Sequence, residues 1–194
     1  DKNAYLASGG YIYAVNLTNG AEVWRYPEKQ EANKNFYAPP ALKDDLLVAG
    51  SYNHEIYGLD ANTRAERWTY AKATNRWVAS PLIIDDLIYA PNSDGTLYVL
   101  TLDGLLSWSV DIGGELWAQP ATNGTLVFIP SLNHKLYAFD IASHAETWAV
   151  DLKGSLVNSV VLDEKGDLYI GNIAGQLFKI RADDGRILNE TTLS

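Results

Sequence analysis

The 194-residue sequence has no cysteine, which excludes disulfides, thiolate metal sites and cysteine nucleophiles. It also has no methionine, so it does not begin at its own initiator, and we expect a leader or a longer N-terminal region before it. Basic residues are few, and 15 Lys and Arg against 24 Asp and Glu give a net charge of −9, which disfavours binding to nucleic acid or anionic lipid. No apolar run approaches the roughly 20 residues that a bilayer-spanning helix needs.

What the chain does contain is a repeated tryptophan phrase. Trp24, Trp68, Trp108 and Trp148 stand 44, 40 and 40 residues apart. Each closes a similar run of letters, namely YAVNLTNGAEVW, YGLDANTRAERW, YVLTLDGLLSW and YAFDIASHAETW. A period near 40 predicts a repeat architecture, in which each unit can bury its apolar face only against its neighbours.

Each repeat is expected to form four antiparallel strands. Within residues 77–108, four runs rich in Val, Ile, Leu, Tyr and Trp are separated by Asp85-Asp86, Asp94-Gly95 and Asp103-Gly104, residue types that tolerate the positive φ of tight hairpins. Four-stranded units in series predict an all-β fold, a β-propeller. We expect one propeller domain or propeller fragment over residues 1–194, with blades at about 4–27 (incomplete), 35–72, 76–112, 115–152 and 155–193. Closure of five blades into a ring and membership of a larger propeller both stay open.

The tryptophan phrase resembles the repeat of quinoprotein-like propellers, the pyrroloquinoline quinone (PQQ) repeat family, whose pattern is approximately A-x-D-x-x-T-G-x-x-x-W. The first blade matches it at Ala14, Asn16, Asn19, Gly20 and Trp24. Later blades depart from it, because Arg64 and His144 replace the glycine and Asn189 stands where a fifth tryptophan would fall. The resemblance covers essentially the whole chain. It implies that the four repeated tryptophans dock each blade on its neighbour.

The resemblance also carries an enzyme alternative, a fragment of a PQQ-dependent dehydrogenase that would use the quinone with Ca²⁺. The enzymes that this repeat resembles most closely are eight-bladed and far longer. Many of them stack the quinone on an adjacent-cysteine disulfide, which this chain cannot form, and no Glu, Asn and Asp set maps onto the metal and base positions. We therefore expect no catalytic residue, no metal ligand and no cofactor.

A candidate binding surface comes from the segments FYAPP, WVASP, LWAQP and LVNSV at residues 36–40, 77–81, 116–120 and 156–160, which we expect to be the first, axis-lining strand of each blade. The candidate ligand-binding residues are Phe36, Tyr37, Arg76, Trp77, Glu115 and Trp117. Together they would form an aromatic, mixed-charge cup at the mouth of the channel. The alternative is that these rings seal the blade interfaces, since large side chains in alternating strands are more often core than site.

These observations predict a non-catalytic binding or scaffold propeller that presents its loops and the axial cup to a protein or a small-molecule ligand. Nucleic acid is not an expected partner, and the unclosed edge of the first blade invites self-association. Relatives of the repeat act in bacterial envelope assembly and as extracytoplasmic sensor domains. The resemblance therefore implies an exported protein, periplasmic or at the cell surface.

Overall fold

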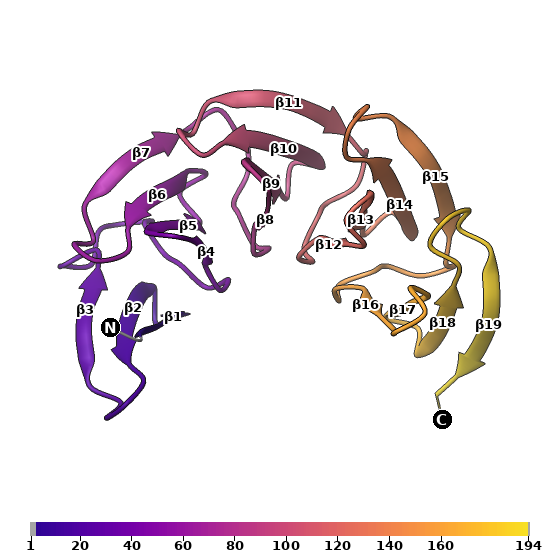
Figure 1. Cartoon of the computed structure of the whole chain (residues 1–194), viewed down its shortest axis with the longest axis horizontal. Coiled ribbons are helices and arrows are strands. Elements are labelled where there is room, and N and C mark those ends of the chain that lie inside the picture. Colours follow the sequence, from indigo (N-terminus) through magenta and orange to yellow (C-terminus); the bar gives the residue numbers. More distant parts are fainter. Residues whose placement is uncertain (1–2, 194) are drawn as a thin grey trace.

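The computed structural model describes residues 3–193, and the regular elements in this part of the chain are all β-strands. They form five antiparallel sheets, one of three strands and four of four strands, that stand side by side as blades in an open arc (Figure 1). The propeller architecture predicted from the repeat is confirmed. Within these residues there is no helix of the length and apolarity that crossing a membrane requires.

Each blade is a meander whose strands pair in chain order. Blade 1 has three strands, β1 (Asn3–Ser8), β2 (Tyr11–Asn16) and β3 (Glu22–Tyr26). Blade 2 runs from β4 (Ala41–Lys43) through β5 (Leu46–Gly50) and β6 (Ile56–Asp60) to β7 (Glu66–Tyr70), and blade 3 from β8 (Leu82–Ile84) through β9 (Leu87–Pro91) and β10 (Thr96–Thr101) to β11 (Leu106–Asp111). Blade 4 comprises β12 (Ala121–Thr122), β13 (Leu126–Pro130), β14 (Lys135–Asp140) and β15 (Glu146–Asp151), and blade 5 comprises β16 (Val161–Leu162), β17 (Leu168–Gly171), β18 (Gln176–Ile180) and β19 (Ile187–Thr192).

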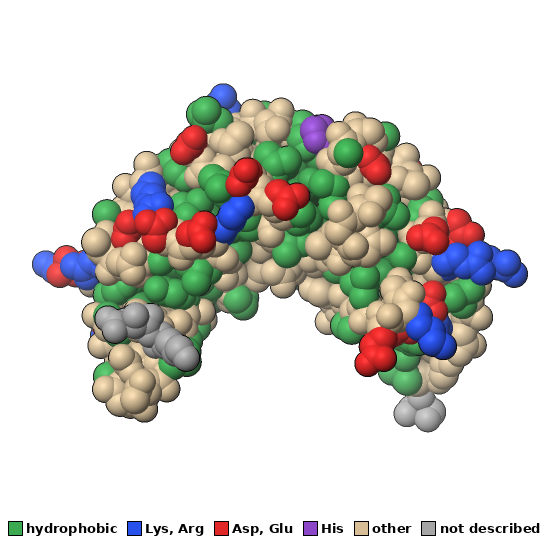
Figure 2. All heavy atoms as spheres, viewed as in Figure 1, with side chains coloured by type: hydrophobic (Ala, Val, Ile, Leu, Met, Phe, Trp, Pro, Cys, Tyr) green, Lys and Arg blue, Asp and Glu red, His purple; other side chains and the backbone are tan. Residues whose placement is uncertain are grey.

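The arc has short strands inside and long strands outside. The first strands of blades 2 to 5 lie on its concave side, and the last strand of every blade lies on its convex rim (Figure 1). The space-filling view shows a crescent that is open between its two ends (Figure 2). By repeat position, β1 corresponds to the second strand of the other blades, so blade 1 has no inner strand among residues 3–193.

The turn residues behave as their types predict. In the turns between first and second strands, Asp44, Asp85, Gly124 and Gly166 have positive φ, and in the next turns Gly10, His54, Gly95, His134 and Gly175 do. The turns between the last two strands repeat this at Gly20, Arg64, Gly104, His144 and Gly185, with φ between 62° and 76°. Arg64 and His144, which replace the glycine of the repeat, therefore keep its left-handed backbone conformation.

The segments at residues 36–40, 77–81, 116–120 and 156–160 are not strands, contrary to our expectation. They are linkers that lead into the short inner strands, which begin at Ala41, Leu82, Ala121 and Val161. Pro39-Pro40, Pro81 and Pro120 explain this for three of the four, because proline has no N–H to donate to a ladder.

The four repeated tryptophans lie at the junctions between blades. Trp24, Trp68 and Trp148 each donate the indole N–H to a carbonyl of the next blade, at Ala61 (3.1 Å), Leu102 (2.7 Å) and Ala182 (2.9 Å). Trp108 instead stacks on the His144 ring of the next blade, with centroids 4.7 Å apart. Each indole thus covers the third turn of the following blade, and four apolar clusters fill the four junctions beneath.

Candidate functional site

The linkers between blades are held at one repeated geometry on one face of the arc, which we call the linker face. In each linker, one backbone N–H donates to a carbonyl in the second turn of the blade before the linker. The C=O of the residue before it accepts from a backbone N–H in the second turn of the blade after the linker. The donors are Phe36, Trp77, Leu116 and Leu156, over 3.2–3.3 Å, and the acceptors are Asn35, Arg76, Glu115 and Ser155, over 3.0–3.3 Å. Both sides of every linker are therefore fixed by backbone, and side chains at these positions are presented in register.

This register separates the predicted cup residues into two groups. Phe36 and Trp77, at the donating position, are 0% and 1% exposed and plug the junctions between blades. Tyr37 and Trp117, one residue later, are 52% and 38% exposed. Successive side chains of an extended segment point to opposite sides, which is why neighbours in the sequence differ so sharply. The structure does not bring all six predicted residues together on one surface.

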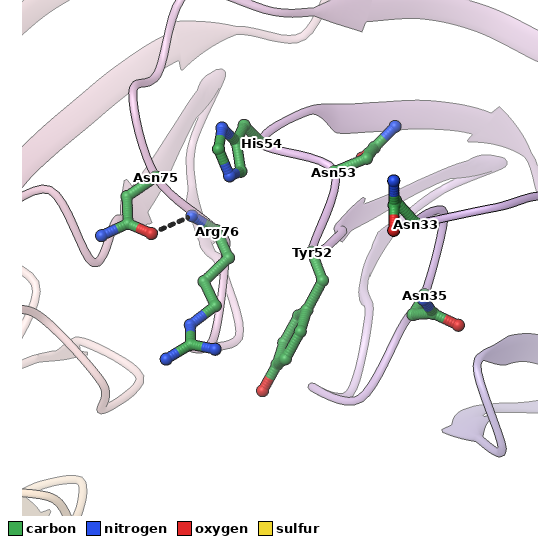
Figure 3. A pocket seen from close by; sticks show the side chains of 7 residues that line it. All are labelled: Asn33, Asn35, Tyr52, Asn53, His54, Asn75 and Arg76. Carbon is green, nitrogen blue, oxygen red and sulfur yellow. Dashed lines mark hydrogen bonds between the residues drawn. The ribbon is translucent and has the colours of Figure 1, made fainter.

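Tyr37 is part of a small cluster with Tyr52 and Arg76, whereas Trp117 lies in another linker. The centres of the Tyr37 and Tyr52 rings lie 4.7 Å apart in an edge-on arrangement, and the Arg76 guanidinium lies over the Tyr52 ring, 5.4 Å from its centre. Figure 3 shows Tyr52 and Arg76 side by side, although they come from the second turn of blade 2 and the following linker. A cation over a tyrosine face is favourable by about 0.5–1 kcal/mol at an exposed site.

A polar cavity of about 510 Å³ opens beside this pair. Its lining residues come from two linkers and one turn, and they are Asn33, Asn35, Tyr52, Asn53, His54, Asn75 and Arg76 (Figure 3). Three backbone segments that are distant in sequence thus converge, and they offer amide donors and acceptors, a hydroxyl, an imidazole and a guanidinium. The cavity can hydrogen-bond a polar ligand or a loop of a partner.

Of the predicted site residues, Arg76 alone lines this cavity, and Tyr37 reaches it through Tyr52. Glu115 and Trp117 belong to the linker that precedes blade 4, where the Trp117 indole N–H donates to the Glu115 carboxylate over 2.8 Å. Tyr52 and the asparagines of the cavity were not predicted from the sequence. The available signal was topological, since in a propeller the second turn of each blade lies beside the linker.

The charge of the cavity differs from that of the whole chain. No carboxylate lines it, although the net charge is −9, and within residues 3–193 Arg76 forms no ion pair. A second cavity, of about 350 Å³ at the junction of blades 2 and 3, has its cations already paired. There Arg67 contacts Asp45 at 2.6 Å and Lys43 contacts Asp86 at 2.9 Å. Of these two cavities, the linker-face cavity is the one whose cation has no ion pair within residues 3–193.

A polar network of Lys34, Tyr26 and Glu66, in which the first two are buried and Glu66 is exposed, joins blades 1 and 2. Lys34 is 8% exposed, donates to the Tyr26 hydroxyl over 3.0 Å and lies 3.3 Å from Glu66. Burial and the hydrogen bond to Glu66 raise the pKa of Tyr26 above its ordinary value. Burial acts to raise the pKa of Glu66, but the Tyr26 hydroxyl and the Lys34 ammonium together lower it. All three groups are satisfied by one another, so this network serves structure.

Residues 3–193 contain no group of three or more His, Asp or Glu side chains arranged to hold a metal ion. We therefore assign no residue to a calcium site of the kind that the dehydrogenase alternative requires.

Comparison with known proteins finds a matching family model. The family model described as "Outer membrane protein assembly factor BamB" matches residues 8–118 and 103–188. The curated BamB of Moranella endobia is 24% identical over 96% of this chain and 51% of its own length. This chain thus spans about half the length of that curated relative, and less of others, such as 35% of the BamB of Legionella pneumophila.

Two solved structures share the fold. The crystal structure of BamB from Moraxella catarrhalis matches with a TM-score of 0.82 and 22% identity, over 97% of this chain and 57% of that one. The quinohemoprotein alcohol dehydrogenase of Comamonas testosteroni matches with a TM-score of 0.86 but 11% identity, over 42% of its own chain. At these identities the likeness shows a common propeller fold.

Proposed function

The chain belongs to the PQQ-like propeller family of the outer membrane protein assembly factor BamB, and from that premise we propose that it is a non-catalytic scaffold in the assembly of outer membrane proteins. The proposal places it outside the cytoplasm, in the periplasm or at the cell surface. It also assigns the linker face, rather than an enzymatic pocket, as the surface that binds a protein partner.

The observation that carries the proposal is the register of the linker face. Four linkers are each held to two blades by backbone hydrogen bonds, so the backbone that carries their side chains is fixed at equivalent positions. Tyr37, Tyr52, Arg76 and Trp117 are aromatic or arginine residues, the types that contribute most to protein interfaces. Rigid anchors lose little conformational entropy when a partner binds.

The test is genetic and biochemical. Deletion of the gene in its host should lower the amount of folded outer membrane proteins, measured by heat-modifiability on gels, and the intact gene should restore it. The double variant Tyr52→Ala with Arg76→Ala should fold but fail to restore. Glu146→Ala, on the convex rim, is the matched control and should restore fully. If the double variant restored the folded outer membrane proteins fully, the linker face would not be the surface that binds the partner.

Two finer predictions about partners belong to the same proposal. A small polar ligand fits the 510 Å³ cavity, whose size is within the range of about 300–1,000 Å³ usual for ligand sites. A second copy of the chain could add a strand to β1, whose six residues pair on one side only. Sedimentation of the wild type and of Leu6→Pro separates a strand-paired dimer, which proline should disrupt, from a monomer.

The dehydrogenase alternative has its own test. Addition of PQQ with Ca²⁺ should leave the melting temperature of a scaffold unchanged. A ligand present at 100 times its Kd would stabilise the folded state by about 2.7 kcal/mol and raise the melting temperature measurably. Such a rise would favour the alternative.

A further inference from the structure

The seven polar residues that line the linker-face cavity fall into two groups, according to whether other residues of the chain already engage their side chains. The engaged group consists of three asparagines, namely Asn35, held by the Gln30 amide (2.9 Å), Asn53, held by the Tyr57 hydroxyl (2.7 Å), and Asn75, held by the Ser93 carbonyl (3.2 Å). These amides form a wall that is fixed in place before any ligand binds.

The other four lining residues, Asn33, Tyr52, His54 and Arg76, make no side-chain hydrogen bond within residues 3–193. The hydrogen bond drawn in Figure 3 uses the backbone N–H of Arg76, which donates to Asn75 over 2.9 Å. The Arg76 guanidinium lies over the Tyr52 ring, and this contact leaves its N–H groups free, because they lie in the guanidinium plane. A guanidinium, an imidazole, a phenol and an amide are therefore available to a ligand.

The charge of the cavity selects the charge of the ligand. Arg76 is the one lining residue with a permanent charge, and it is a cation. The carboxylates in the adjoining turns are engaged elsewhere, since Glu55 accepts from Asn53 over 2.6 Å and Asp94 accepts from the Thr74 backbone N–H over 3.0 Å. One fixed cation among neutral donors suits a singly charged anion. The planar fork of the guanidinium matches the two oxygens of a carboxylate.

One wall of the cavity comes from a linker that is longer than the other three. Phe36 follows the tryptophan of the blade before it by 12 positions. The equivalent distances in the later linkers are 9, 8 and 8 positions, for Trp77, Leu116 and Leu156. Asn33 and Asn35 both lie in the longer linker. This wall is therefore an addition to the repeat and does not follow from the propeller fold itself.

Lys34 anchors the longer linker between its two cavity residues. The Lys34 side chain is buried, and its ammonium lies 3.3 Å from a carboxylate oxygen of Glu31 and 3.3 Å from one of Glu66. The same ammonium lies 4.7 Å from the centre of the Tyr57 ring. The residues on either side of Lys34 are thereby held at the cavity, and a wall held in this way loses little conformational entropy when a ligand binds.

The other junctions on the linker face do not repeat this set of side chains. Tyr52 and His54 come from the second turn of blade 2, and Arg76 comes from the linker that follows. The residues at the three equivalent positions are Ser93, Gly95 and Glu115 for blade 3 and Leu132, His134 and Ser155 for blade 4. Neither set contains a guanidinium or a phenol, and the first has a carboxylate in place of Arg76. The site is therefore particular to blade 2.

We infer that the linker-face cavity binds a small hydroxylated carboxylate, of which a sugar acid is an example, and that Arg76 is the anchor of the carboxylate. The carboxylate accepts two N–H groups of the Arg76 guanidinium. Tyr52, His54 and Asn33 pair with the hydroxyl groups, because a phenol, an imidazole and an amide can each both donate and accept, as an alcohol does. The inference rests on the small-ligand prediction of the proposed function and makes its chemistry specific.

The test titrates the isotope-labelled chain with glucuronate. Glucose is the matched probe, because it has the same ring with a hydroxymethyl group in place of the carboxylate. We expect glucuronate to shift the NMR signals of the Arg76 guanidinium and the Asn33 amide saturably. Glucose should bind about tenfold more weakly or less, because it cannot pair with the charged donor. Equal affinity for the two sugars, or no saturable shift with glucuronate, would overturn the inference.

Variants locate the anchor. Arg76→Gln should weaken glucuronate binding about tenfold or more, and Arg76→Lys, which keeps the charge but loses the planar fork, should give an intermediate loss. Arg186→Gln is the matched control, because it makes the same change in net charge at an exposed position in blade 5, and it should bind glucuronate like the wild type. An equal loss in Arg76→Gln and Arg186→Gln would show that only the overall charge attracts glucuronate, which contradicts the inference.

A final pair of measurements separates this inference from its alternatives. Inorganic phosphate that binds the cavity more tightly than glucuronate would overturn the choice of a carboxylate. The host assay with Tyr52→Ala and Arg76→Ala reports on the protein partner alone. If that variant fails to restore folded outer membrane proteins while glucuronate does not bind the wild type, the scaffold proposal stands and the ligand site is wrong. If glucuronate binds and the variant restores fully, the ligand site stands and the docking of a partner there is wrong.

Discussion

The junctions on the two sides of blade 3 perform the same task with different contacts. At the junction of blades 2 and 3, the Trp68 N–H donates to Leu102 over 2.7 Å and the ring lies against Gly104. At the junction of blades 3 and 4, Trp108 stacks on His144 at an interplanar angle of 17°, and its buried N–H has no hydrogen-bond partner within the described chain. An aromatic stack thus stands in for a hydrogen bond.

The difference shows what the glycine of the repeat contributes. Without a side chain it lets the indole approach the backbone closely enough to reach a carbonyl. Loss of the glycine is not sufficient to break the bond, because Trp24 still donates to Ala61 over 3.1 Å although Arg64 occupies the glycine position. What sets the junction of blades 3 and 4 apart is the flat imidazole of His144, on which the Trp108 ring stacks.

The largest effect is expected from Trp68→Ala. Truncating a large aromatic core residue costs about 3–5 kcal/mol of unfolding free energy, and here a hydrogen bond to Leu102 is lost as well. Trp108→Ala should cost less, because it removes no hydrogen bond. Denaturant unfolding measures both, and Trp117→Ala, on the exposed linker face, is the control expected to change stability by less than about 1 kcal/mol. Equal losses at Trp68 and Trp108 would remove the distinction between the junctions.

The next effect is expected from Gly104→Val. The new side chain would meet the Trp68 ring at 2.4 Å and force a β-branched residue to φ of 76°, at a cost of about 2–4 kcal/mol. Gly20→Val is the matched control, because it carries a similar φ of 71° with nothing within 4 Å. The difference between the two variants in denaturant unfolding isolates the contact with the indole. Equal losses of unfolding free energy in the two variants would mean that backbone strain alone causes the loss.

A finer comparison replaces each indole by a benzyl ring. Trp68→Phe removes a bonded N–H, and the net loss attributable to that bond is about 1 kcal/mol. Trp108→Phe removes an N–H that is buried without a partner, so the loss should be smaller by about that amount. Paired urea titrations measure the gap. A larger loss at Trp108 would show that its N–H finds a partner, such as an ordered water.

The smallest effect on stability is expected from lowering the pH. Asp140, in the turn that receives Trp108, accepts hydrogen bonds from the backbone N–H and the hydroxyl of Ser143, and these lower the pKa of its carboxyl below the usual value. A lowered folded pKa gives stability that is present at neutral pH and is lost as the pH falls below about 4 toward the folded value. Blade 3 has Thr101 at this position, so its turn lacks the effect.

Asp140→Asn should therefore flatten the loss of melting temperature between pH 5 and pH 2, relative to the wild type. Asp183→Asn, an exposed carboxylate in a turn of blade 5, is the control and should leave the curve unchanged. An identical slope for wild type and Asp140→Asn would show that the carboxylate does not stabilise the turn.

The sequence was informative wherever a property repeats. The period of the tryptophans, the strand count per blade and the positive-φ turns follow from local residue types, and the structure confirms each of them. The site was harder to predict. Phe36 and Tyr37 are adjacent and both aromatic, yet one plugs a junction and the other faces solvent. The backbone hydrogen bond from the Phe36 N–H to the Gly10 carbonyl, a tertiary contact, orients the Phe36 side chain into the junction.

The structure of one blade follows from the amino-acid sequence alone, because a four-stranded meander depends on alternation and on turn residues that act within about 40 positions. The sequence also determines that blades stack, because each repeat has more apolar surface than it can bury alone. Which side chains share a surface depends on how the blades are arranged in space. Tyr52 meets Arg76 because the arc brings together a turn of blade 2 and the linker that follows the blade, a proximity that no local pattern encodes.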